Sequence, residues 1–219
     1  NNGNTPKSWR ENITSSGIVI DVETNEIVAE GLAMPHSPTL INGELYVLLS
    51  ATGELVIPQT IGGKPVTSIK DYAFRNCSRL TSITIADSVA SIELGAFYNC
   101  TGLTSITIPD SVEIIGDGAF AGCINLPKIE VGEENRKYTD VNGVLFDKKK
   151  MLLLNYPAGK PDTTYKIPDD VTSIRTYAFY RSLNLISVTI PDSVTSVKRE
   201  AFHKCTNLTN ITIGDGVTS

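Results

Sequence analysis

A pattern of apolar and polar positions recurs along most of the chain. Each copy begins Leu-x-x-Ile-x-Ile, and its last four residues alternate apolar and polar, which predicts a half-buried strand. A second apolar pair follows, such as Val112 and Ile115, and predicts a short extended segment on an opposite wall. Each copy then closes with Ala-Phe, and these phenylalanines are Phe74, Phe97, Phe120, Phe179 and Phe202.

The copies recur at a fixed period, which indicates a solenoid in which each coil contacts mainly its neighbours. The first strands are expected to end at Ile57, Ile85, Ile108, Val131, Ile167, Ile190 and Ile213, with spacings of 28, 23, 23, 36, 23 and 23 residues. We therefore expect a curved, mainly β solenoid of about seven rungs with few helices. Its phenylalanines should stack as an interior column, because stacking is what buries the apolar face of each coil.

The pattern LTSITIPDSV…AFxxC resembles the BspA-like, treponemal-type leucine-rich repeat family over about residues 53–219. The resemblance implies a leucine-rich-repeat solenoid of a bacterial, secreted or cell-surface protein; the family also occurs in some parasitic protists. It also implies adhesion to host proteins or to other cells.

The first part of the chain lacks the period, so we expect two parts, 1–52 and 53–219. Apolar runs flank Glu23-Thr24-Asn25 and Asn42-Gly43, and Asn-Gly between apolar runs is a strong hairpin signal. We expect a β-meander that serves as a cap over the edge of the first rung. Residues 9–54 also resemble a fragment of an uncharacterised bacterial β-propeller family with an MPHSPRW motif, in which Thr39 and Leu40 replace Arg and Trp here. This fragment would supply roughly one blade, so only local strands are carried over.

An insert of about residues 132–162 interrupts the period and omits one Ala-Phe corner. It contains the turn Asn142-Gly143, a tip of three lysines and the run MLLLNYP, so we expect a β-hairpin that packs on the solenoid. Either the insert is structural, or it is a dedicated recognition loop, since loops often carry binding residues.

Composition narrows the classes of partner. The formal net charge of −5 argues against nucleic acid and anionic membrane, both of which need a basic patch. No apolar stretch is long enough to span a bilayer. The chain has no initiator Met and no signal sequence, so we expect a mature or trimmed form.

The four cysteines, Cys77, Cys100, Cys123 and Cys205, share one repeat position, which Ser182 occupies in another copy. We expect structural free thiols, because parallel side chains in such a column give poor disulfide geometry. No metal site and no cofactor are expected, because no histidine or second cysteine lies nearby at ligand spacing.

Catalysis is not expected, because no nucleophile, base and orienting group converge in the sequence. His203 falls at a corner position held by other residue types in the other copies, so we expect a surface residue. His36 lies in MPHSP, where we expect a loop histidine rather than a general base.

The candidate partner-binding residues are the outward positions of the first strands. Stacked, they should form a flat Ser/Thr array that Lys128, Glu130 and the insert interrupt. The candidates are Ser82, Thr84, Ser105, Thr107, Ser187, Thr189, Asn210 and Thr212. Threonine also suits any solvent-facing strand, so the array is consistent with solubility alone, with a shallow surface for a protein or glycan, or with ordering of water or ice.

We expect an extracellular or cell-surface adhesion module that recognises a protein or glycan partner, with no nucleic acid and no membrane insertion. The alternative is a structural spacer that binds nothing. A contiguous exposed aromatic or apolar patch, for which Tyr98 and Tyr180 are candidates, would favour binding, and a uniformly polar surface would favour the spacer. The last rung should be uncapped, so that the protein continues or the edge pairs with another molecule.

Overall fold

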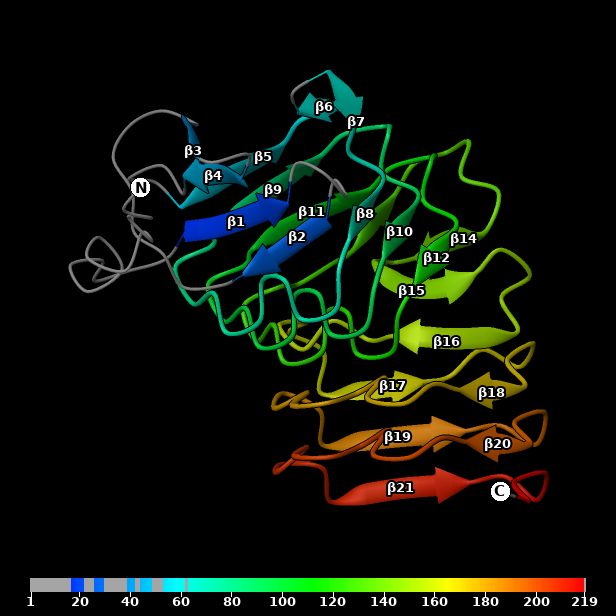
Figure 1. Ribbon diagram of the computed structural model, residues 1–219. Coiled ribbons are helices and arrows are strands. Elements are labelled where there is room, and N and C mark those ends of the chain that lie inside the picture. Colours follow the sequence, from blue (N-terminus) through cyan, green and yellow to red (C-terminus); the bar gives the residue numbers. More distant parts are fainter. Residues whose placement is uncertain are drawn as a thin grey trace.

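The computed structural model describes residues 53–61 and 63–218, together with the backbone of four strands before them (17–21, 26–29, 39–41 and 44–48). Within this part the chain forms strands and turns and contains no helix. Figure 1 shows successive coils stacked in parallel, as the 23-residue period predicts. The prediction of a mainly β solenoid is confirmed.

The first wall of the solenoid is formed by the alternating strands. Seven strands lie on it, in a four-stranded sheet of order β13-β11-β9-β5 and a three-stranded sheet of order β17-β19-β21. Their bounds are Glu54–Ile57 (β5), Ser82–Ile85 (β9), Ser105–Ile108 (β11), Glu130–Val131 (β13), Thr164–Lys166 (β17), Ser187–Ile190 (β19) and Asn210–Ile213 (β21). All pairs are parallel, and β17 ends one residue before the predicted Ile167.

The second wall carries the shorter strands that the second apolar pairs predict. One sheet has the order β12-β10-β8 and the other the order β14-β15-β16-β18-β20. Their bounds are Ser68–Ile69 (β8), Ser91–Ile92 (β10), Ile114–Ile115 (β12), Tyr138–Val141 (β14), Val144–Asp147 (β15), Leu152–Asn155 (β16), Ser173–Ile174 (β18) and Ser196–Val197 (β20). A small hairpin of β6 (Thr60–Ile61) and β7 (Lys64–Pro65) forms the enlarged turn of the first rung.

The N-terminal strands form the two predicted hairpins, but not a meander. The strands are β1 (Gly17–Asp21), β2 (Glu26–Ala29), β3 (Thr39–Ile41) and β4 (Glu44–Leu48). Their order is β2-β1-β4-β3, so the hairpins meet through β1 and β4 and not through β2 and β3. Hairpin signals are local and do not say which edges of two hairpins meet. The predicted capping role involves side chains that lie outside the described residues. His36 also lies outside the described residues.

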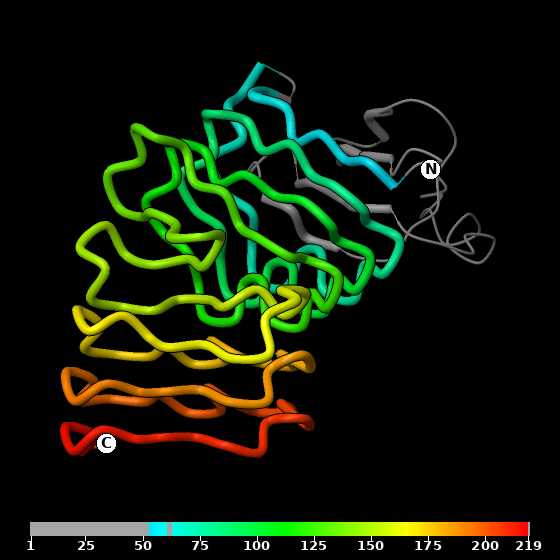
Figure 2. The backbone as a smooth tube through the Cα atoms, turned by 180° about the vertical axis from the view of Figure 1, so that it is seen from behind, coloured from blue at the N-terminus to red at the C-terminus, as the bar shows by residue number. Residues whose placement is uncertain are grey.

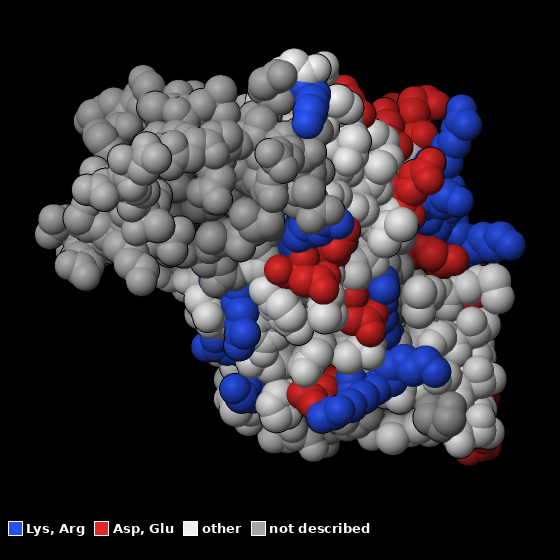
Figure 3. Space-filling model, viewed as in Figure 1, with Lys and Arg blue, Asp and Glu red and all other residues white. Residues whose placement is uncertain are grey.

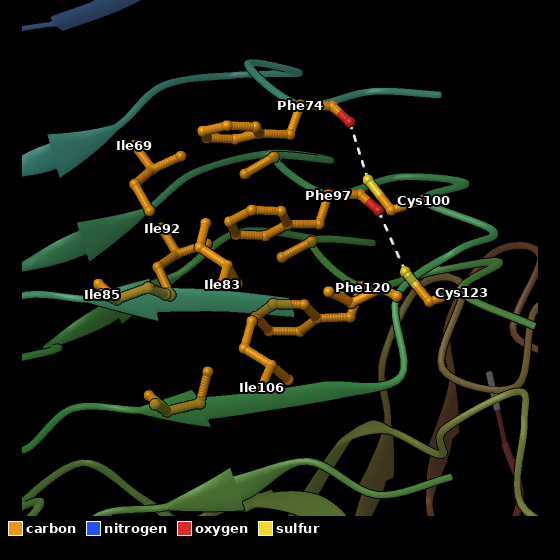
Figure 4. Packing of buried hydrophobic residues seen from close by; sticks show 14 of the residues in the cluster. Ile69, Phe74, Ile83, Ile85, Ile92, Phe97, Cys100, Ile106, Phe120 and Cys123 are labelled. Carbon is orange, nitrogen blue, oxygen red and sulfur yellow. Dashed lines mark hydrogen bonds between the residues drawn. The ribbon is translucent and has the colours of Figure 1, made fainter. Parts of the chain in front are cut away.

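Phenylalanine rings stack along the interior, as Figure 4 shows for Phe74, Phe97 and Phe120. The ring centroids of Phe74 and Phe97 are 5.0 Å apart, and those of Phe97 and Phe120 are 5.6 Å apart. Phe179 and Phe202 stack in the same way at 4.7 Å. Stacked rings bury large apolar areas that no single coil could cover, so the column joins neighbouring coils.

The cysteine column lies beside the phenylalanines and consists of free thiols. The thiols of Cys100 and Cys123 donate hydrogen bonds to the carbonyl oxygens of Phe74 and Phe97, at Sγ–O distances of 2.8 and 3.2 Å (Figure 4). Cys205 repeats this bond to Phe179 at 2.8 Å. Each thiol thus links its coil to the preceding one.

The thiols are expected to react slowly in the folded protein. A hydrogen bond with Cys123, and then burial, raises the pKa of Cys100, and burial raises the pKa of Cys205. Because the folded state holds these thiol protons more tightly than the unfolded state, the protonated thiols stabilise the folded state fully below the ordinary thiol pKa. This stabilisation is lost as the pH rises above that pKa. The free energy of unfolding should therefore decline above about pH 9.

Urea titrations across pH 7–11 measure this decline. Alkylation followed by mass spectrometry should label the half-buried Cys205 before the buried Cys100. Equal labelling of both thiols, or an unchanged free energy, would contradict it.

The insert lies inside the solenoid, rather than packing on its outside as the sequence suggested. Alternate side chains of β15 and β16 point to opposite faces, as in any strand. Leu145 and Leu154 join the apolar core of the preceding coils, whereas Val144, Phe146 and Leu153 join the core of the following coils. The hairpin therefore separates two stacks of coils, an N-terminal stack and a C-terminal stack, and contributes to both.

The insert omits the Ala-Phe pair, as expected, but an aromatic side chain still fills that corner. Tyr156 occupies that corner, because its backbone N–H donates to Ala178 at 2.8 Å, as Phe97 does to Ala119 at 2.7 Å. Its ring stacks on Phe179 with centroids 5.2 Å apart. Tyrosine replaces phenylalanine here, and asparagine replaces the usual alanine before it.

The two stacks do not share one direction. In Figures 1 and 2 the coils before β14–β16 are tilted relative to the coils after them. The four-stranded first-wall sheet ends at β13, and the next first-wall sheet begins at β17. The insert therefore bends the solenoid and breaks its first wall.

Candidate functional site

The outward side chains of the first wall stand in register on neighbouring strands. In the N-terminal stack, Ser82 lies opposite Ser105, Thr84 lies opposite Val56, and Thr107 lies opposite Glu130. Thr84, Ser105 and Thr107 are exposed and Ser82 is half-buried. These four candidate residues form one short array of hydroxyl groups.

The remaining candidates form a second array on the C-terminal stack. Ser187 lies opposite Asn210, and Thr189 lies between Lys166 and Thr212. Asn210 and Thr212 are exposed, and Ser187 and Thr189 are half-buried. The side chains stay short and polar along this array except at Lys166.

The eight candidates therefore form two arrays, divided at the insert that was expected to interrupt them. Next to β13, the backbone N–H of Ile129 donates to the carbonyl of Gly143 at 2.9 Å, where a strand of the following rung would otherwise pair. The turn Asn142-Gly143 has φ values of +52° and +78°, which suit a tight hairpin and do not continue a first-wall strand. The turn thus separates the arrays.

A charged pair lies at the edge of the first array. The hydrogen bond between Lys128 and Glu130 raises the pKa of Lys128 and lowers the pKa of Glu130. Both side chains are exposed, so the pair contributes little to stability. Together with the turn, it marks where the hydroxyl array ends.

The candidate aromatic residues serve a different purpose from the exposed patch expected of them. Tyr98 of the N-terminal stack contacts Tyr177 and Tyr180 of the C-terminal stack, at centroid distances of 6.1 and 5.3 Å. Tyr180 is only 4 % exposed. Burial, and then a hydrogen bond with Tyr180, raises the pKa of Tyr98. These rings join the two stacks across the bend.

Polar contacts cross the same bend. Arg175 pairs with Asp117, and the guanidinium of Arg181 donates to the side-chain oxygen of Asn99. The partners are 58 and 82 residues apart in the sequence. The bend is therefore held by specific contacts from both stacks.

A groove of about 590 Å³ opens on the second wall where the bend parts β12 from β14 and β16. Its lining includes exposed Ile114, half-buried Leu152 and buried Leu154, with charged groups around them. The hydroxyl of Tyr138 accepts a hydrogen bond from the backbone N–H of Ile115 at 2.9 Å and donates to the carbonyl of Glu113 at 3.3 Å. Tyr138 therefore pairs with the backbone hydrogen-bonding groups at the edge of β12, so another strand cannot pair with them.

The lining of the groove contains no histidine or cysteine, and its Asp117 and Arg175 pair with each other. His203 is exposed at a corner, where it stacks on Tyr180. In the described part of the chain, no three histidine, cysteine or acidic side chains gather as a metal site would require. No helix of that part is long and apolar enough to cross a membrane.

Sequence reasoning missed the residues that make the bend. Asn135, Tyr138 and Arg175 belong to the insert or contact it from the next coil, and a repeat pattern carries no information about contacts that occur once. The only local signal was Asn135 in a turn, since asparagine often bonds to nearby backbone groups.

Two family models match the chain. The model of the BspA type leucine rich repeat region matches residues 53–160 and 158–219, in six copies. The model of a domain of unknown function (DUF4915) matches residues 1–79. A comparison with curated proteins found no match.

Solved structures of bacterial proteins share the fold. A leucine rich cell surface protein from Faecalibacterium prausnitzii is 36 % identical, with a TM-score of 0.67, and the match covers 75 % of this chain and 42 % of that protein. The pneumococcal vaccine antigen PcpA is 27 % identical, with a TM-score of 0.69, and the match covers 75 % of this chain and 40 % of that protein. The chain thus spans less than half the length of these relatives. Because the repeat model matches most of the sequence and the coils have the same architecture, the chain belongs to the BspA type leucine rich repeat family.

Proposed function

We propose that this chain is a binding module of a bacterial surface protein, and that it recognises a protein or glycan through the outer face of its first wall. The observation that carries the proposal is the alignment of exposed hydroxyl groups in register on rigid parallel strands. Flat extended faces of this kind are the usual binding surfaces of solenoids. Support also comes from the two relatives, one described as a cell surface protein and the other as a vaccine antigen.

Short hydroxyl side chains suit such a surface. They give up little rotamer freedom when a partner covers them, and they can donate or accept hydrogen bonds. The same face is held by the phenylalanine column behind it, so binding would not require the strands to rearrange. Leucine-rich-repeat solenoids typically serve as non-enzymatic scaffolds, and the proposal assigns no catalytic role to this one.

The alternative function is a structural spacer within a longer surface protein. It is favoured by Tyr180, because this candidate aromatic is buried in the contact between the stacks instead of forming an exposed patch. The last strand, β21, has exposed Ile211 and Ile213, and pairing of this edge with another molecule stays a prediction.

Substituting lysine for three outward threonines tests the binding proposal. The variant Thr84→Lys/Thr107→Lys/Thr189→Lys places long charged side chains on both arrays, and lysine on a solvent-facing strand leaves the core intact. We expect saturable binding of the wild-type chain to one member of a panel of extracellular-matrix proteins and neutral glycans. The variant should bind it at least roughly tenfold more weakly, because each unfavourable contact at the centre of an interface costs on the order of 1 kcal/mol.

The matched control places three lysines away from the arrays, at exposed positions, and changes the net charge by the same amount. It is Ser78→Lys/Ala90→Lys/Thr195→Lys. It should bind like the wild type. Binding that the threonine variant retains would remove the first wall as the site, and absence of binding to every panel member would favour the spacer.

A further inference from the structure

Basic and aromatic side chains gather at most of the corners that follow the stacked phenylalanines. We call the set formed by Arg75, Tyr98, Tyr180, Arg181, His203 and Lys204 the corner strip. The guanidinium of Arg75 lies 5.7 Å from the ring centroid of Tyr98, and the ammonium of Lys204 lies 5.7 Å from that of Tyr180. His203 stacks on Tyr180 at 5.7 Å, and Arg181 bonds to Asn99 beside Tyr98.

The bend brings the strip together from both stacks. Arg75 and Tyr98 belong to the N-terminal stack, and Tyr180, Arg181, His203 and Lys204 belong to the C-terminal stack. Contact between Tyr98 and Tyr180 joins the two groups. The strip is therefore an elongated surface that follows the stacking direction, and it lies on a different side of the coils from the first wall.

Backbone requirements do not explain the cations of this strip. Arg181 and Lys204 have φ values of +57° and +58°, in the left-handed region that side chains other than glycine and asparagine rarely adopt. Equivalent positions in other coils carry Asn76, Asn99 and Gly122, which tolerate this conformation. The backbone conformation therefore does not call for a cation at either position.

The charge of the strip contrasts with that of the chain. The formal net charge is −5, yet neither Arg181 nor Lys204 forms an ion pair with a carboxylate of the described residues. Figure 3 shows basic side chains along the lower left margin, on the side where the corner loops of Figure 1 lie. Such a strip attracts anionic groups locally while the rest of the surface repels them.

We infer that the corner strip binds an acidic polysaccharide, with carboxylate or sulfate groups of the polymer against Arg181 and Lys204. Guanidinium groups bind such oxyanions through paired hydrogen bonds. A narrow flexible polymer can follow the strip and avoid the acidic surface beside it, which a stiff nucleic acid duplex cannot do. The exposed ring of His203 and the half-buried ring of Tyr98 offer apolar contact for sugar rings.

The test is binding of the whole chain to immobilised chondroitin sulfate, with hyaluronan and neutral dextran as companions. The variant Arg181→Asn/Lys204→Asn removes two cations and supplies the residue that Asn76 and Asn99 provide at equivalent corners. It also loses the bond from Arg181 to Asn99, so a urea titration first checks that the variant remains folded. We expect its dissociation constant for chondroitin sulfate to rise at least roughly tenfold, since it loses two charged contacts. Hyaluronan bound as well as chondroitin sulfate would show that carboxylates suffice, and weaker hyaluronan binding would assign the contact to sulfate.

The matched control, Lys148→Asn/Lys149→Asn, changes the net charge by the same amount at the exposed tip of the insert. It should bind like the wild type. Equal weakening of binding in both variants would mean that the attraction is diffuse, and this would overturn the inference. The inference would also be overturned if the wild-type chain bound dextran, bound a DNA duplex as strongly as chondroitin sulfate, or bound none of the polymers. The threonine variant of the first wall should keep this binding, so that failure of one proposal leaves the other standing.

Discussion

Replacing Phe97 with alanine is expected to lower the free energy of unfolding by about 4 kcal/mol. The ring is fully buried and stacks on Phe74 on one side and on Phe120 on the other. Its removal leaves a cavity inside a column whose neighbours cannot collapse without moving the strands of both adjacent coils. Urea unfolding monitored by circular dichroism measures the change.

Phe202 provides the matched control within the same column. It stacks on Phe179 and is only half-buried, so Phe202→Ala should cost roughly half as much as Phe97→Ala. Equal losses at the two positions would mean that the ring contributes through its own coil and not through stacking. A loss below about 1 kcal/mol at Phe97 would contradict the column as the main source of cohesion.

The column could be predicted from the sequence because a repeat multiplies one signal. Each phenylalanine falls 23 residues from the next within a stack, and the alternation of the first strands is equally regular. Local signals also predicted the turn Asn142-Gly143 and the N-terminal hairpins. The pairing of β1 with β4 could not be predicted, because no local residue preference distinguishes the edges of two hairpins.

Tyr156 could have been found with the same reasoning. It lies 23 residues before Phe179, as Phe179 lies before Phe202, so the period continues through the insert once tyrosine is accepted in place of phenylalanine. The direction of the bend had no such signal. It depends on contacts between residues 58 and 82 positions apart, such as Arg175 with Asp117, which occur only once in the chain.

The candidate site was predicted residue by residue, but its shape was not. The alternation correctly placed four candidates of the N-terminal stack on the outer face, since side chains of a strand alternate between its faces. These are Ser82, Thr84, Ser105 and Thr107. The insert was expected to interrupt the array, but the pattern did not show that the turn at Asn142-Gly143 would take the place of a first-wall strand. The corner cations were visible in the sequence only as unrelated residues, since the bend is what brings Arg181 next to Asn99.

Asn135 holds the start of the insert, and replacing it with alanine is expected to cost about 4 kcal/mol. Its side chain is fully buried. The amide nitrogen donates to the carbonyls of Pro109 and Val112 at 2.7 and 3.1 Å, and the amide oxygen accepts from the backbone N–H groups of Lys137 and Tyr138 at 2.9 and 2.8 Å. Alanine would leave four backbone groups without this partner, and each stranded buried group costs roughly 1–3 kcal/mol.

The variant Asn135→Asp separates the hydrogen bonds from the packing, because aspartate has the same shape. At pH 7 its carboxylate would face the carbonyls of Pro109 and Val112, which repel it, so the loss should be at least as large as for alanine. Burial and this repulsion would raise the folded pKa of the new carboxyl group above its unfolded value. The variant is then most stable below the unfolded pKa of about 4, and it loses stability as the pH rises. Lowering the pH from 7 to 4 should therefore narrow the difference in free energy of unfolding between this variant and the wild type. Urea titrations at the two pH values measure it. An Asn135→Asp variant as stable as the wild type at pH 7 would show that Asn135 acts through its shape, and the insert would then be held to the N-terminal stack chiefly by Leu145 and Leu154.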